Sequence, residues 1–317
     1  GTPLFAPNKG NSMSGIEKFY PRAKCTGDIL KEMGYYLSFM QGSSTHFSGI
    51  DKFYETHGFD SVKGKEQFLD DLEDRSYLNG WGLYDDTLLD YAFEEFVTLS
   101  EEKEKFALFT ISLDTHHPNG HLSDSCKDYL YGDGANDILN SFKCSDTLVS
   151  KFIEKIQGSK YADNTIIVIS SDHLAMRNTA SDMMPGKEER RNLFVILDNE
   201  SKSYRSIDKN GTTLDIAPTI LSKLKIYTDV GLGRNLFTST SIFDEFKNIN
   251  SKLASWRETL LLFWEFPKLS NTLRVNFKKT NVRIGNQILA LPVLLKIDKT
   301  SQQISPLFEE GVPEKLY

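Results

Sequence analysis

Short, mainly apolar runs alternate with longer amphipathic stretches over the first two thirds of the chain, and this alternation limits the fold most. The clearest apolar runs are Phe106–Leu113 and Thr165–Ser170. Between them, Leu148, Phe152 and Ile156 recur at helical spacing. Apolar strands separated by amphipathic helices are typical of a parallel sheet covered on both faces. We therefore predict an α/β fold with a mostly parallel central sheet and helices on both faces.

The same patterns predict where the individual elements lie. We expect strands at Tyr35–Met40, Phe106–Leu113, Thr165–Ser170 and Asn192–Leu197. We expect helices over residues 27–33, from Asp85 or Asp86 onward, from a cap at Ser145 onward, and over Leu214–Leu224. The acidic pairs at Asp70–Asp71 and Asp85–Asp86 are interpreted as caps or solvated faces, without a catalytic role.

The pattern changes towards the C-terminus. A helix over Lys252–Phe263 precedes short alternating segments at Thr272–Phe277, Val282–Ile284 and Ile288–Ile297. These segments predict a small antiparallel appendage. We therefore divide the chain into a catalytic domain, residues 1–245, and an α+β appendage, residues 246–317.

Composition excludes several classes of protein. The net charge of −7 argues against a nucleic-acid surface, which needs clustered Lys and Arg. The longest apolar run, Ile288–Ile297, contains a proline and is about half as long as the roughly 20 residues of a membrane-spanning helix. The chain opens with GTPLFAP, without a methionine or signal peptide. We expect a segment upstream that carries a membrane anchor.

A carboxylate and an imidazole follow one predicted strand directly. Asp172 and His173 come at the end of IIVISSDH. Ligands of α/β sheets bind beyond the carboxyl ends of the strands. An Asp–His pair there suits Zn²⁺, Mn²⁺ or another divalent ion, although a solvated turn or helix cap is the alternative.

Two further polar patches follow predicted strands. His116 and His117 follow Phe106–Leu113, which we expect in the same sheet as Thr165–Ser170, so that one imidazole could bind a phosphoryl oxygen or protonate a leaving alcohol. The alternative is a loop histidine that bonds backbone carbonyls. Gln41 and His46 follow Tyr35–Met40 and are candidates for binding a substrate head group, or else belong to a surface loop.

The three cysteines constrain the compartment weakly. Cys126 and Cys144 flank a loop rich in Gly, Asp and Asn, where a disulfide would restrict the chain. A bridge there would imply an export compartment and leave Cys25 over. Two unrelated thiols are the alternative.

Together these segments resemble one family. The order of THHP, NTIIVISSDH, DIAPTIL and a Gly-x-Gly-Arg-x-Leu turn resembles the alkaline phosphatase and sulfatase superfamily. Within it, CTGDILKEMGY, QGSSTHFSGIDKFYETHGFD, WGLYDDTLLD and SSDHLAMRNTA are similar to the phosphoglycerol transferases that modify osmoregulated periplasmic glucans, relatives of the lipoteichoic acid synthases. The resemblance extends from residue 1 to about residue 306.

The resemblance implies a site and a reaction. A threonine nucleophile, a glutamate and an Asp–His pair hold one divalent ion in this family, Mn²⁺ or Mg²⁺ rather than Zn²⁺. The pair matches Asp172 and His173, and His116 matches the histidine that contacts the phosphoryl group. The threonine and glutamate belong to segments upstream of residue 1, so we expect residues 1–317 alone to be inactive. An upstream cysteine would pair with Cys25, leaving Cys126 and Cys144 as a second bridge.

The function implied is transfer of phosphoglycerol from phosphatidylglycerol to a periplasmic glucan through a covalent threonine intermediate, at the periplasmic face of the bacterial inner membrane. Alternatives on the same fold are a sulfatase, a phosphodiesterase or a phosphoethanolamine transferase. A non-catalytic glucan-binding remnant is a further alternative, because the nucleophile is not within the chain.

Overall fold

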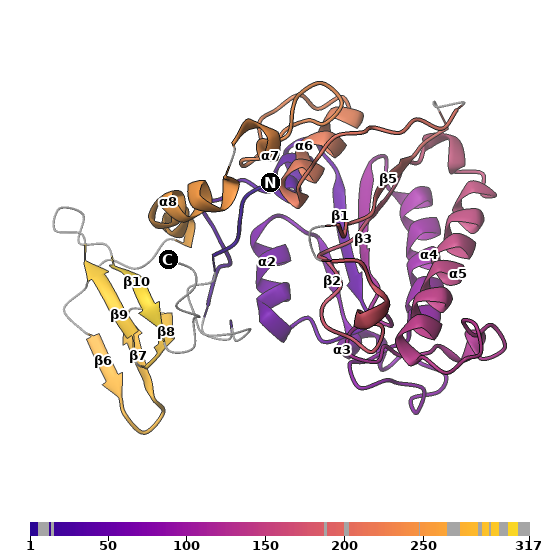
Figure 1. The fold of residues 1–317 in the computed structure, drawn as a ribbon, viewed down its shortest axis with the longest axis horizontal. Helices are drawn as coiled ribbons and strands as arrows, with labels where there is room; N and C mark the ends of the chain where they lie inside the picture. The colour runs from indigo at the N-terminus through magenta and orange to yellow at the C-terminus, as the bar shows by residue number, and fades with distance from the viewer. Residues whose placement is uncertain are drawn as a thin grey trace. The chain divides into compact units, whose positions relative to one another are not determined.

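The chain forms two compact units in a computed structural model (Figure 1). The structure describes residues 1–5, 13, 16–186, 189–199, 203–246, 248–264, 273–284, 287–291, 293–297 and 304–309. The first unit comprises residues 1–33, 45–59 and 207–317, and the second comprises residues 34–44 and 60–206.

A parallel sheet forms the centre of the second unit. Its middle strand, β1 (Tyr36–Gln41), lies between β2 (Ser61–Lys63) and β3 (Phe106–Ile111), and both neighbours run parallel to it. Strand β1 is buried from its second residue onward, as expected for a strand covered on both faces. The predicted parallel sheet is thus confirmed.

Helices of the second unit cover this sheet. They are α3 (Lys65–Phe68), α4 (Asp85–Glu102) and α5 (Asp137–Gln157). Met40 of β1 packs in a buried cluster with Leu83, Leu88 and Ala92, and Phe152 of α5 packs against that cluster. The prediction of a helix capped by Ser145 was wrong. Helix α5 begins at Asp137, because the Asn136 side chain accepts a hydrogen bond from the Leu139 backbone amide and caps the helix earlier.

The other two predicted strands differ from expectation. Strands β4 (Ile167–Ser170) and β5 (Phe194–Leu197) pair antiparallel as a sheet of their own, rather than joining β3 in one parallel sheet. A parallel pair needs a long crossover connection, usually helical. Among the described residues between β4 and β5, only the 3₁₀ turn Ser181–Met183 is helical, and the chain returns antiparallel.

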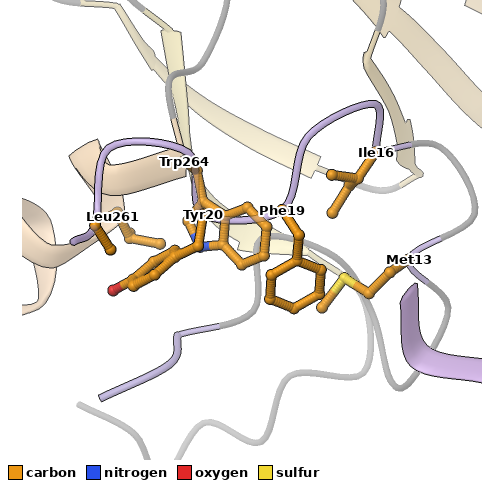
Figure 2. Packing of buried hydrophobic residues seen from close by; sticks show 7 residues of the cluster. Met13, Ile16, Phe19, Tyr20, Leu261 and Trp264 are labelled. Carbon is orange, nitrogen blue, oxygen red and sulfur yellow. The ribbon is translucent and has the colours of Figure 1, made fainter. Parts of the chain in front are cut away.

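The first unit consists mainly of helices around an aromatic core. Its α-helices are α1 (Thr26–Glu32), α2 (Ile50–Thr56), α6 (Thr213–Lys223), α7 (Ile242–Glu245) and α8 (Ile249–Leu261). The rings of Phe19 and Tyr20 pack against Trp264 (Figure 2). Their centroids lie 4.7 and 5.1 Å, respectively, from the centroid of the Trp264 ring. The 3₁₀ turns Phe47–Gly49 and Leu262–Trp264 also belong to the first unit, whereas Asp124–Cys126, Ala162–Asn164 and Ser181–Met183 lie in the second.

Helix α6 is held to the glycine-rich turn that follows it. The buried carboxylate of Asp215 accepts hydrogen bonds from the backbone amides of Thr212 and Arg234, both at 2.7 Å. Gly233 is required in this turn, because a Cβ atom there would collide with the Leu214 carbonyl. Asp215 therefore has a structural role.

Small antiparallel sheets near the C-terminus complete the first unit. Strands β6 (Leu273–Asn276), β7 (Asn281–Ile284) and β8 (Gln287–Ala290) form one sheet, and β9 (Val293–Ile297) pairs with β10 (Ile304–Glu309). The predicted antiparallel segments are confirmed, whereas the domain boundary after residue 245 stays a prediction. No helix in the described part of the chain is long and apolar enough to cross a membrane.

Candidate functional site

The predicted metal pair lies in the loop directly after β4. The Asp172 Oδ2 and His173 Nε2 atoms are 3.4 Å apart, and their side chains are 72% and 59% exposed. The His173 backbone amide donates to Asp172 Oδ1 at 2.8 Å. The ring atom Nδ1 lies 2.8 Å from the Leu174 carbonyl, which accepts its hydrogen. That bond orients the imidazole and leaves Nε2 as the atom that can ligate.

This donor set suits a divalent cation in part. A carboxylate oxygen and an imidazole nitrogen are ligands that Zn²⁺ and Mn²⁺ accept, and a closed tetrahedral shell needs four. Within the described ranges, no third carboxylate, imidazole or thiol completes a cluster with Asp172 and His173. The pair therefore supplies about half of a metal shell.

His116 is held between two rings in the loop that follows β3. Its ring centroid lies 4.4 Å from that of Trp81 and 4.7 Å from that of His117. Its Nδ1 atom donates to the His117 carbonyl at 2.8 Å. His116 Nε2 has no hydrogen-bond partner among the residues that the structure describes, so this atom is available to a phosphoryl oxygen.

A third imidazole in the same loop was missed by the sequence analysis. The His121 backbone amide donates to the Asp114 carbonyl at 2.7 Å, which brings His121 back towards His116. Burial and, to a smaller extent, the charge of the nearby His116 lower the pKa of His121 below its usual value. The loop thus contains His116, His117 and His121. Their closeness in the sequence was the signal that could have identified His121.

The loops after β3 and β4 meet, although their strands do not pair. The Thr179 backbone amide donates to the Pro118 carbonyl at 3.1 Å. Asn136, the cap of α5, donates to the Thr179 carbonyl at 3.2 Å. The loop that carries His116 and the loop that carries Asp172 are therefore joined within the second unit.

The other two predicted binding residues are engaged locally. Gln41 is buried, and its amide nitrogen donates to the Ser44 carbonyl at 3.0 Å. His46 belongs to the first unit, where its exposed ring lies 2.7 Å from the Asp51 carboxylate. Their substrate contacts stay predictions.

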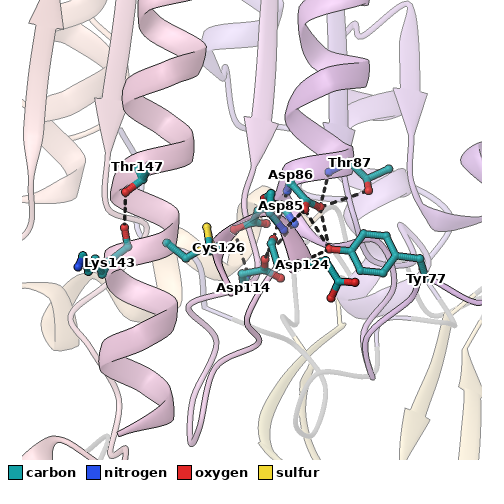
Figure 3. The surroundings of a disulfide bond; sticks show 12 residues. Tyr77, Asp85, Asp86, Thr87, Asp114, Asp124, Cys126, Lys143 and Thr147 are labelled. Atoms are coloured by element: carbon teal, nitrogen blue, oxygen red, sulfur yellow. Dashed lines mark hydrogen bonds between the residues drawn. A yellow bond between two sulfur atoms is a disulfide. The ribbon is translucent and has the colours of Figure 1, made fainter. Parts of the chain in front are cut away.

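Two buried carboxylates lock helix α4 to the loop after β3 (Figure 3). Asp85 accepts hydrogen bonds from the backbone amides of Leu113, at 2.7 Å, and Asp114, at 3.1 Å. Asp114 in turn accepts from the Asp85 amide at 3.1 Å and from the Ser123 hydroxyl. We call this reciprocal arrangement the aspartate clamp. The clamp thus ties the start of α4 to the start of the loop that carries His116.

Burial sets the protonation of the clamp. Burial raises the pKa of Asp85 to about 6, against the opposing effect of hydrogen bonds from Leu113 and Asp114. Burial and then the charge of Asp85 raise the pKa of Asp114 to about 7. A carboxyl group with a raised pKa is a common mark of a functional site, but here both groups are occupied in holding backbone.

A second cluster that the sequence analysis missed lies in the first unit. Cys25 Sγ is 3.6 Å from His57 Nε2, and His57 Nδ1 is 2.8 Å from Asp28 Oδ2. These three side chains offer ligand atoms within 4.8 Å of one another. Burial and then the charge of Asp28 raise the pKa of Cys25 to about 12. The thiol therefore stays protonated at neutral pH and is not an activated nucleophile.

A disulfide closes the loop beside the aspartate clamp. Cys126 of the 3₁₀ turn and Cys144 of α5 are bridged, with Cα atoms 5.6 Å apart. The Tyr77 hydroxyl accepts from the Asp124 amide at 2.7 Å and donates to Asp86 at 2.9 Å (Figure 3). The bridge and this tyrosine hold the loop on both sides.

Comparison with known proteins matches these features to one family. The profile of the sulfatase family matches residues 6–226. The chain is 38% identical to phosphoglycerol transferase I of Salmonella choleraesuis and 37% identical to that of Escherichia fergusonii, each over 311 residues. Each alignment covers 98% of this chain and 40% of the relative. The chain thus spans about two fifths of the length of these curated relatives.

Solved structures agree on the fold. The lipoteichoic acid synthase LtaP of Listeria monocytogenes superposes with a TM-score of 0.59 at 20% identity, over 70% of this chain and 58% of LtaP. A protein in the alkaline phosphatase superfamily from Vibrio parahaemolyticus superposes with a TM-score of 0.55 at 22% identity, over 96% of this chain and 67% of that protein. With its parallel sheet, covering helices and Asp–His loop, the chain belongs to the sulfatase family and has the fold of the alkaline phosphatase superfamily.

Proposed function

We propose that the protein to which this chain belongs transfers phosphoglycerol from phosphatidylglycerol to a periplasmic glucan. The observation that carries the proposal is the 38% identity to a phosphoglycerol transferase I, which covers 98% of the chain. The loop-borne pair Asp172–His173 and the nearby His116 loop supply groups that such a reaction needs.

In this proposal Asp172 and His173 hold one Mn²⁺ or Mg²⁺ ion. When bound, such an ion lowers the pKa of an attacking alcohol and balances charge on phosphoryl oxygens. Asp172 offers Oδ2 and His173 offers Nε2, the two atoms that lie 3.4 Å apart. The bond from His173 Nδ1 to the Leu174 carbonyl fixes the ring for this role.

His116 acts on the phosphoryl group and the leaving alcohol. Its Nδ1 hydrogen is donated to the His117 carbonyl, so Nε2 is the ring atom proposed to act in the reaction. In the first half-reaction a threonine hydroxyl outside residues 1–317 forms a bond to phosphorus, and the bond from phosphorus to diacylglycerol oxygen breaks. Diacylglycerol leaves with the proton. A glucan hydroxyl then takes the phosphoglycerol from the threonine and restores its hydroxyl.

The compartment proposed is the periplasmic face of the inner membrane. The Cys126–Cys144 bridge supports it, because disulfides persist in oxidising compartments such as the bacterial periplasm. The membrane attachment that this location requires is proposed to come from the rest of the protein.

The test compares Asp172→Ala with a neighbouring control in the full-length protein. Asp172→Ala should slow release of diacylglycerol from phosphatidylglycerol at least about 100-fold, since loss of even an outer-shell group at a metal site costs 10- to 100-fold. Asp182→Ala, an exposed aspartate in the same loop, should keep full activity. Bound manganese, measured by calorimetry, should fall only in the first variant.

Two results would contradict the proposal. One is full transferase activity in Asp172→Ala with unchanged melting behaviour. The other is a wild-type protein that leaves phosphatidylglycerol intact but cleaves an aryl sulfate, which would favour the sulfatase alternative that the family name raises.

A further inference from the structure

The β6–β7 hairpin of the first unit is unusually basic. Residues 273–284 contain four cationic side chains and no carboxylate, in a chain whose net charge is −7. The cations are Arg274, Lys278, Lys279 and Arg283. None of them forms an ion pair with another residue in the described part of the chain.

Two of these cations lie directly opposite each other. In the antiparallel register Arg274 pairs with Arg283, and Asn276 pairs with Asn281. Residues opposite each other in such a pair project from the same face of the sheet, and like charges there destabilise it. An anionic group that binds between the two guanidinium groups would offset that repulsion.

The same hairpin also exposes apolar side chains. Phe277 begins the turn after β6 and is 81% exposed, and Leu273 and Val275 of β6 are 46% and 42% exposed. On β7, in contrast, Val282 and Ile284 are buried in the core of this small sheet. The turn that joins β6 to β7 lies at the end of the hairpin (Figure 1). Phe277, Lys278 and Lys279 therefore all belong to this turn.

We propose that the β6–β7 hairpin docks on the surface of an anionic lipid bilayer. Basic residues attract anionic head groups, and an exposed aromatic side chain beside them inserts at the boundary between head groups and acyl chains. A groove of about 850 Å³, lined by Arg274, Asn276, Phe277 and Arg283 among others, offers room for a phosphate head group. An anionic glucan would also satisfy the arginines, and the binding experiment below separates it from the bilayer.

This inference goes beyond the proposed function, because binding to the bilayer requires neither metal nor turnover. It assigns the C-terminal sheet a task of its own. The exposed tip, rather than the Asp172–His173 loop, would determine the affinity of residues 1–317 for vesicles.

The experiment measures co-sedimentation of the 317-residue chain with lipid vesicles. We use phosphatidylcholine alone, an equimolar mixture with phosphatidylglycerol, and an equimolar mixture with phosphatidylserine. The chain should bind both anionic mixtures and not phosphatidylcholine alone, and added salt should weaken binding. Lys278→Gln/Lys279→Gln should weaken it roughly 25-fold, from about fivefold for each basic residue near an anionic surface.

Matched controls separate the hairpin from general charge. Lys24→Gln/Lys52→Gln removes two exposed lysines of the same unit and should leave binding unchanged. Phe277→Ser should weaken binding, whereas Phe243→Ser, at another exposed phenylalanine, should not. Circular dichroism of each variant checks that it folds.

Three outcomes would overturn the inference. They are failure to bind anionic vesicles, binding that the Lys278/Lys279 and Phe277 variants leave unchanged, and hairpin variants that weaken binding of an anionic glucan while vesicles do not bind. Equal binding to vesicles with phosphatidylserine and with phosphatidylglycerol would show that binding depends on lipid charge at the hairpin and not on recognition of the proposed substrate. Failure of the proposed transferase activity would leave that result untouched.

Discussion

The aspartate clamp predicts an unusual dependence of stability on pH. The pKa values of Asp85 and Asp114 are raised to about 6 and about 7, from a usual value of 3.8. Between about pH 4 and pH 7 the folded state therefore binds protons that the unfolded state has released. The free energy of unfolding should fall as pH rises through that window.

The magnitude follows from the number of protons involved. Each proton held only by the folded state changes the free energy of unfolding by about 1.4 kcal/mol per pH unit. One proton shared by Asp85 and Asp114 thus corresponds to about 3 kcal/mol between pH 5 and pH 7. Asp114→Asn removes one of the two ionisable groups, and it also removes an acceptor for the Asp85 amide and the Ser123 hydroxyl. That loss should cost about 1–3 kcal/mol at acidic pH.

The assay is urea unfolding followed by circular dichroism across this pH range, with the disulfide intact. The wild-type chain should lose stability as pH rises, and Asp114→Asn should show a shallower slope than the wild type, because Asp85 alone remains to hold a proton. Asp90→Asn, an exposed residue of the same helix, should keep the wild-type slope. A wild-type chain that gains stability from pH 5 to pH 7, or an Asp114→Asn variant with an unchanged slope, would refute the reasoning.

Two further predictions concern the cysteines. Replacing Cys126 and Cys144 with serine should lower the free energy of unfolding by about 3 kcal/mol, because the bridge closes a loop with a sequence separation of 18; an unchanged urea midpoint would contradict this. Cys25 should react with iodoacetamide at neutral pH at least about 100-fold more slowly in the folded chain than in urea, because burial and the charge of Asp28 raise its pKa to about 12. Equal rates in both states would show that the thiol is not held protonated.

The sequence alone predicted the elements whose signals are local. The apolar runs placed β1 and β3 within two residues of their observed bounds, and the capped amphipathic pattern placed α6 within one. Periodicity is a property of neighbouring residues, so it can be read without knowing how the rest of the chain packs. The same reasoning put His116, Asp172 and His173 in loops directly after strands, where the structure has them.

The pairing of β4 and the start of α5 could not be predicted from the local pattern. The apolar run of β4 indicates a buried strand but carries no information on direction, and its antiparallel pairing with β5 depends on how the intervening loop returns. Ser145 is a good cap by residue type, yet it lies inside α5, because Asn136 offers an earlier cap.

Only tertiary structure decided which distant groups became neighbours. Asp85 is interpreted from the sequence as a helix cap or start, and packing buries it together with the distant Asp114 as a clamp. Cys25 and His57 become neighbours in the same way. A side chain's residue type determines which bonds it can form, whereas its dielectric surroundings and its partners depend on the packed fold, and these in turn set its pKa and its chemistry.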